Sequence, residues 1–203
     1  GDFGADRFRL LRKLYEDRGG RPEAGRRLPP NSAGSADLAF RWEDDAPVEL
    51  GASGESWGGV LVVDADSAST WDHVIVRSTA GISASGLAIT GGVTFYASPL
   101  VFHQVQFIGS TAEDALNAVF SRVVLDEVEF TDTASDAFDG DSVSGSITLS
   151  RFHQIGGDAI DLSGSQVKGD RISFMDIGDK AVSAGEATTG TFTNLDISGV
   201  GIG

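Results

Sequence analysis

Aspartates recur at a fixed interval in the second half of the chain. The segments DALN (114–117), DAFD (136–139), DAID (158–161) and KAVS (180–183) are spaced 22 residues apart. Such a period is typical of one structural unit stacked on itself, with equivalent residues about 4.8 Å apart. The repeat therefore predicts two columns of side chains: Asp114, Asp136, Asp158 and Lys180 in one, and Asn117, Asp139, Asp161 and Ser183 in the other.

Carboxylates stacked in this way repel one another, by roughly 1 kcal/mol in water and about 3.5 kcal/mol at an effective dielectric constant of 20. Three alternatives can explain how the columns tolerate this repulsion. Each aspartate can accept backbone N–H bonds at the turn before its strand. Alternatively, Asp114, Asp136 and Asp158 bind calcium, which takes six to eight oxygen ligands.

The third alternative is catalysis. Asp136 and Asp158 would form a carboxylate pair with one raised pKa, and Lys180 would be the general base of a lyase. Lys180 also has a structural interpretation, because a cation at the end of the column relieves its repulsion. The residues assigned to ligand binding next to these are Asn117, Asp139, Asp161 and Asp141.

Other catalytic constellations are missing from the sequence. There is no cysteine and no G-x-S-x-G segment for a nucleophile. His103 and His153 occupy different repeat positions, so we expect them, like His73, to be solvent-facing residues of strands. The GG pairs at 58–59, 91–92 and 156–157 fall in expected turns and not before helices, which excludes phosphate-binding loops.

The same period runs through the apolar residues that must position these side chains. The first apolar column consists of Phe107, Phe130, Phe152, Phe174 and Ile197. In most coils a second apolar column lies two residues before it, which is the spacing of one face of a strand. A further step of three residues toward the N-terminus breaks this alternation and predicts a turn.

Three short strands and three turns in about 22 residues predict an all-β fold, a single-stranded right-handed parallel β-helix. Upstream, Trp71, Val74 and Val76 match the same positions but precede Phe102, Val105 and Phe107 by 31 residues. We therefore expect a longer loop within 78–92 and a first coil at 57–63. Trp57, Trp71, Phe95 and Tyr96 either pack in the core of these early coils or stack on sugar rings.

The predicted domain organisation has three parts. Residues 1–20 contain a short amphipathic α-helix at 5–18, which either caps the β-helix, ends a preceding domain or binds a membrane surface. Residues 21–50 are expected to be a linker, and 51–203 the β-helix. Gly203 falls where another strand should begin, so the β-helix is expected to be truncated at its C-terminal end.

Charge excludes several classes of partner. The net charge is −15, and residues 1–30 hold 8 of the 15 basic residues. The remaining chain is therefore strongly acidic, which argues against nucleic acid and anionic membranes and favours calcium or cationic partners. No apolar run reaches transmembrane length, and no signal peptide is visible.

The segments GGVTFY (91–96), EDALN (113–117), SDAFDGD (135–141), GGDAIDLSGS (156–165) and GDKAVSAGE (178–186) carry a family resemblance. They resemble bacterial right-handed parallel β-helix proteins of the pectin-lyase-like superfamily, closest to the β-helix segments beside CotH-type domains. GGDAID is similar to the NTDGxD segment of polygalacturonases, which places Asp158 at a catalytic position. The next coil has DKAVS instead of paired aspartates, and the chain has no GHG or RIK motif.

The resemblance implies a secreted or cell-surface bacterial module. We expect a non-catalytic protein that binds carbohydrate or acts as a structural scaffold. Its partners would be a polysaccharide or other domains of the same parent protein. The alternative is a lyase or glycoside hydrolase that cleaves an acidic polysaccharide with the stacked aspartates. A third interpretation is a spacer within a larger protein.

Overall fold

The structure is a computed structural model that describes residues 39–40, 47–52, 54–84 and 87–202. They belong to one compact unit, Asp37–Gly203. These residues form strands, turns and loops without a helix. The helix predicted at 5–18 lies outside the described residues. Within the described residues, no helix is long and apolar enough to cross a membrane.

The strands form two parallel sheets and one hairpin. The ten-stranded sheet contains β1 (Ala39–Phe40), β2 (Val48–Leu50), β4 (Ser69–Arg77), β8 (Leu100–Ile108), β10 (Arg122–Asp126), β11 (Glu129–Thr133), β13 (Ser144–Thr148), β14 (Arg151–Ile155), β16 (Gln166–Lys180) and β18 (Thr189–Ile202). The six-stranded sheet contains β3 (Val60–Val63), β7 (Gly91–Tyr96), β9 (Asp114–Val119), β12 (Asp136–Asp141), β15 (Ile160–Ser163) and β17 (Val182–Ala184). The hairpin pairs β5 (Ile82–Ala84) with β6 (Leu87–Ile89).

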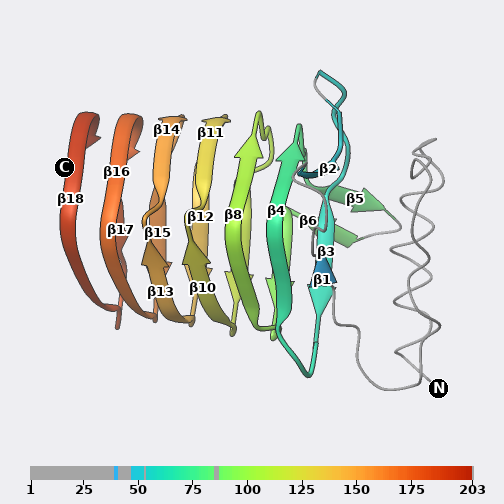
Figure 1. The fold of residues 1–203 in the computed structure, drawn as a ribbon, viewed down its shortest axis with the longest axis horizontal. Helices are drawn as coiled ribbons and strands as arrows, with labels where there is room; N and C mark the ends of the chain where they lie inside the picture. The colour runs from blue at the N-terminus through green and yellow to red at the C-terminus, as the bar shows by residue number, and fades with distance from the viewer. Residues whose placement is uncertain (1–38, 41–46, 53, 85–86, 203) are drawn as a thin grey trace. The chain divides into compact units, whose positions relative to one another are not determined.

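Each coil contributes to three faces, and the strands of successive coils lie side by side (Figure 1). The β10 face consists of β10, β13 and the N-terminal parts of β4, β8, β16 and β18. The β11 face consists of β11, β14 and the C-terminal parts of the same four long strands. The six-stranded sheet is the β12 face. Every pairing between coils is parallel, which confirms the predicted parallel β-helix.

Three corners per coil explain the broken alternation in the sequence. At each corner a single residue has a positive φ, and these residues recur in every coil. The second corner, between the β10 and β11 faces, holds His73, Gln104, Glu127, Leu149, Arg171 and Asn194, with φ between 51° and 55°. This corner coincides with the step of three residues that the sequence marks as a turn. Glycine is not used at this corner, although the left-handed region costs other residues roughly 1–2 kcal/mol.

Stacked apolar side chains fill the interior. Phe107, Phe130, Phe152 and Phe174 form a continuous stack in which successive ring centroids are 4.7, 5.0 and 5.3 Å apart. All four are almost completely buried. The stack arises because parallel strands in register bring the same repeat position together in every coil.

Trp71 and Phe95 are also fully buried, and Trp71 stacks on Phe102 with centroids 4.6 Å apart. Of the four aromatic residues considered for sugar stacking, these two therefore belong to the core. Trp57 packs against the core and is partly buried. Tyr96 remains 44% exposed.

Two features fall in the irregular early part of the unit. The strands β1 and β2 lie within 21–50, the range predicted as linker, and both pair with β4. The hairpin β5–β6 occupies the longer loop expected within 78–92. This insertion accounts for the 31-residue spacing between β4 and β8.

The strained corners give a first testable prediction. Leu149 has a φ of 52° and is 39% exposed, so its side chain contributes little packing to offset the left-handed conformation. Asparagine adopts this conformation more readily. We expect Leu149→Asn to raise the free energy of unfolding by about 0.5–1 kcal/mol in urea titrations. Thr131→Asn, in the middle of β11, is the control and should lower it. An unchanged or lower midpoint for Leu149→Asn would contradict the strain argument.

Candidate functional site

The predicted aspartate columns form on the β12 face. Asp136 lies opposite Asp114, and Asp139 lies between Asn117 and Asp161. Ser183 follows Asp161 in the next coil. The two columns are connected through Asn117, whose Nδ2 donates to Asp114 Oδ2 at 3.0 Å and to Asp139 Oδ2 at 3.1 Å.

Backbone groups hold two of the column aspartates. Asp136 Oδ1 accepts the N–H of Asp158 at 2.8 Å, and Asp158 Oδ1 accepts the N–H of Lys180 at 2.8 Å. In both cases the donor belongs to the next coil, whereas the sequence suggested a bond within the same turn. These two carboxylates therefore tie successive coils together.

Lys180 neutralises the end of the first column. Its Nζ lies 2.6 Å from Asp179 Oδ2 and 3.3 Å from Asp158 Oδ2. The hydrogen bond to Asp179, and next the one to Asp158, raise the pKa of the lysine above its usual value. A lysine held in its charged form is unsuited to be a general base. The contacts agree with the structural interpretation of Lys180.

Three carboxylates of the β12 face, Asp114, Asp136 and Asp139, have raised pKa values. Burial raises the pKa of Asp114 to about 6, and neighbouring Glu113, Asp136 and Asp161 add to the effect. Burial, followed by the charges of Asp114 and Asp141, raises the pKa of Asp139 to about 7. Burial also raises the pKa of Asp136, against the opposing hydrogen bond from Asp158 N–H. Asp141 itself is exposed at the end of β12.

The β12 face does not supply a clear cation site. In the described part of the chain, groups of at least three His or acidic side chains with ligand atoms within 4.8 Å occur at two other places. Both involve His103, and neither includes Asp114, Asp136 or Asp158. The calcium site and the catalytic roles of Asp136, Asp158 and Lys180 stay predictions.

A second candidate site lies on the β10 face and was not predicted. It is a shallow groove of about 440 Å³ that crosses β10, β13, β16 and β18. Its side chains are mainly hydroxyl and amide groups between two cations. The lining residues are Arg122, Val124, Ser144, Gly145, Ser146, Gln166, Val167, Lys168, Thr189 and Thr191.

The strand register places the two cations. Arg122 lies one residue before Val123, and Lys168 lies one residue after Val167, which occupies the same repeat position two coils later. The two Cα atoms are separated by two strand spacings and two residues, which is about 12 Å. Gly145 lies between them, where a Cβ would collide with the carbonyl oxygen of Val123. The close pairing of β13 with β10 at this point therefore requires glycine.

Arg122 and Lys168 differ from most other cations of the molecule. Among the described residues, Arg77, Arg171 and Lys180 each pair with a carboxylate. Arg122, Arg151 and Lys168 make no ion pair with another described residue, and two of these three line the groove. Unpaired cations are notable in a chain with 30 acidic and 15 basic residues.

Exposed aromatic rings lie at the corner between the β12 and β10 faces, which Phe120 occupies with a φ of 51°. Phe120 is 60% exposed and is two residues before Arg122. Its ring meets that of Tyr96 edge-to-face, with centroids 5.8 Å apart. Both rings are available to a ligand on this side, and Tyr96 is the most exposed residue of the predicted aromatic set.

Comparisons with protein-family models, with curated proteins and with solved structures find no match to this chain.

Proposed function

We propose that this β-helix is a non-catalytic module that binds an anionic polysaccharide in the groove of the β10 face. The observation that carries the proposal is that Arg122 and Lys168, in a strongly acidic chain, make no ion pair with another described residue and line the same groove. Guanidinium and ammonium groups are the natural partners of carboxylate or sulfate groups on a sugar chain.

The rest of the groove fits the same ligand class. Hydroxyl groups of Ser144, Ser146, Thr189 and Thr191 lie between or beside the cations. They can donate to and accept from sugar hydroxyls. The groove is shallow and crosses several coils, which suits an extended chain better than a compact small molecule. Such polysaccharides occur outside cells, so this proposal includes a secreted or cell-surface location and a β-helix of the pectin-lyase-like kind.

The proposal can be tested by titrating polygalacturonate into the protein by isothermal titration calorimetry, with neutral dextran as the comparison ligand. We expect the double substitution Arg122→Gln and Lys168→Gln to weaken polygalacturonate binding about tenfold to hundredfold, because two charge-assisted contacts are lost. Arg151→Gln is the matched control. It removes an equally unpaired charge from the β11 face and should leave binding within about twofold of wild type.

Three outcomes would contradict this function. Equal binding of neutral dextran would show that charge does not contribute to polysaccharide binding. An equal loss with Arg151→Gln would indicate non-specific attraction. Cleavage of polygalacturonate by the wild-type protein, abolished by Asp158→Asn at unchanged melting temperature, would establish the enzyme alternative instead.

A further inference from the structure

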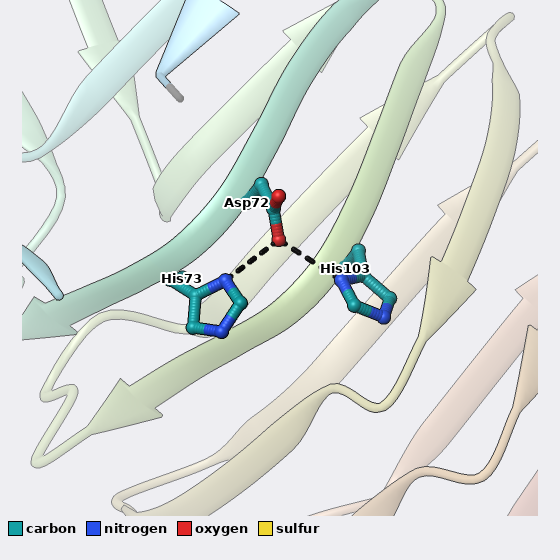
Figure 2. Close-up of side chains that lie close together, drawn as sticks. All are labelled: Asp72, His73 and His103. Carbon is teal, nitrogen blue, oxygen red and sulfur yellow. Dashed lines mark hydrogen bonds and ion pairs between the residues drawn. The ribbon is translucent and has the colours of Figure 1, made fainter. Parts of the chain in front are cut away.

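Two histidines and one aspartate meet at the second corner of the β-helix (Figure 2). Asp72 and His73 are consecutive residues of β4, and His103 comes from β8. Asp72 Oδ1 lies 2.8 Å from His73 Nδ1 and 2.9 Å from His103 Nδ1. One carboxylate oxygen therefore faces a ring nitrogen of each imidazole, as Figure 2 shows.

The fold brings these side chains together in two ways. Asp72 and His103 are direct partners in the parallel register of β4 and β8. His73 occupies the corner itself, with a φ of 54°, so its side chain does not follow the alternation of the strand. The two rings meet edge-to-face with centroids 6.1 Å apart.

The second nitrogen of His103 also faces carboxylates. Its Nε2 lies 3.9 Å from Asp126 Oδ2 and 3.9 Å from Glu127 Oε1, both in the following coil. Histidines that bind metals commonly direct their other ring nitrogen toward a carboxylate or carbonyl, which fixes the ring. His103 has one nitrogen in the cluster and the other facing acidic side chains, at a distance longer than a hydrogen bond.

We propose that Asp72, His73 and His103 bind a divalent transition-metal ion such as Zn²⁺ through Asp72 Oδ1 and the two Nδ1 atoms. Two imidazoles and a carboxylate are a ligand set that zinc and its neighbours in the first transition row accept, with water at the remaining position. Calcium prefers six to eight oxygens and is excluded by this donor set. The proposal is independent of polysaccharide binding.

The geometry is close to what such an ion requires. The three ligand atoms lie within 4.8 Å of one another. Tetrahedral zinc with bonds of about 2.0–2.1 Å needs ligand atoms about 3.3 Å apart, so the present contacts must open by about half an ångström. All three side chains are between one-third and one-half exposed, which gives an ion access and leaves the rings room to rotate.

The test is a calorimetric titration of ZnCl₂ into the full chain at about pH 8, above the ordinary imidazole pKa. We expect wild type to bind one equivalent, and His73→Gln and His103→Gln to weaken binding at least about tenfold. His153→Gln is the matched control. His153 is a half-exposed strand histidine beside a single carboxylate, Asp176, at 3.5 Å. The His153→Gln variant should therefore bind zinc as the wild type does.

Co²⁺ gives a second readout, because low-coordinate sites absorb visible light far more strongly than hexa-aqua cobalt. We expect a visible band in wild type and His153→Gln that is lost in the two ligand variants, while melting temperatures show that both variants are folded. Zinc binding that survives the double substitution His73→Gln and His103→Gln would overturn the proposal. So would a His153→Gln effect as large as that of His103→Gln.

Discussion

Phe130→Ala is expected to lower the free energy of unfolding by about 3–5 kcal/mol. Phe130 is fully buried between Phe107 and Phe152, with ring centroids 4.7 and 5.0 Å away. Truncation removes the apolar surface that the ring buries and leaves a cavity in the middle of the stack. Neighbouring coils are held by their own strand pairing, so they cannot move together to fill that cavity.

The measurement is urea unfolding followed by circular dichroism. Phe120→Ala is the control, because it deletes the same ring from a corner where it is 60% exposed. We expect that variant to lose less than about 1 kcal/mol, the packing of Phe120 against Tyr96 included. Equal losses at both positions would mean that the aromatic stack does not stabilise the solenoid more than surface contacts do.

The phenylalanine stack also explains why so much of the fold could be predicted. Parallel strands in register convert a sequence period into columns in space, so Phe107, Phe130, Phe152 and Phe174 were correctly assigned to one column. The three-residue step before them correctly marked the second corner. The prediction was weaker where the period fails. The strands β1 and β2 are two and three residues long and carry no repeat that would reveal them.

The candidate sites were predicted less completely, for reasons that differ between residues. The aspartate columns were placed correctly because they belong to the repeat. The bonding of Asp136 and Asp158 to the next coil depends on backbone direction, which the period does not determine. Arg122 and Lys168 lie on outward strand positions with no apolar pattern. Their positions relative to Val123 and Val167 were nevertheless readable from the repeat.

The meeting of Asp72 with His103 was hidden by an insertion. The hairpin β5–β6 lengthens the spacing between these residues to 31, so they do not appear in the 22-residue columns. The alignment of Trp71 with Phe102 contained the necessary information, since Asp72 and His103 are the next residues. The pairing of Asp72 with His103 could therefore be predicted from the sequence. The corner geometry that turns His73 toward them could not.

The second large effect expected is a loss of stability as the pH rises. Asp114 and Asp139 have folded-state pKa values of about 6 and about 7, against an ordinary value of 3.8. Between about pH 4 and pH 7 the folded state holds protons that the unfolded state has released. The free energy of unfolding should therefore fall across this interval, by up to about 7 kcal/mol in total, and level off above it.

Other shifted groups do not reverse this trend. The pKa values of Asp72 and Asp170 are lowered, mainly by hydrogen bonds from His103 and Asn194 respectively, so their contribution is lost below the ordinary aspartate range. The hydrogen bond to Asp72 raises the pKa of His103, and its stabilisation disappears as the pH rises, in the same direction as the aspartates. Burial also raises the pKa of Asp136, which acts in the same direction. The loss between about pH 5 and pH 8 is therefore assigned to the aspartates of the β12 face, chiefly Asp114 and Asp139.

Urea midpoints at about pH 5 and pH 8 measure the effect. Substituting both residues, Asp114→Asn with Asp139→Asn, should flatten the pH dependence and make the protein more stable than wild type at the higher pH. Asp196→Asn, which removes an exposed carboxylate of β18 away from Asp114 and Asp139, is the control and should keep the wild-type slope.

Added calcium distinguishes two explanations of how the β12 face tolerates its negative charge, a bound ion or protonated aspartates. If the predicted site at Asp114, Asp136 and Asp158 binds the ion, added calcium will restore stability at the higher pH and a chelator will remove the gain. If midpoints do not respond to calcium, protonation of Asp114 and Asp139 is what relieves the repulsion. Wild-type protein that is more stable at pH 8 than at pH 5 in the absence of calcium would contradict both accounts, because it requires these carboxylates to be stabilised in their charged form without a bound ion.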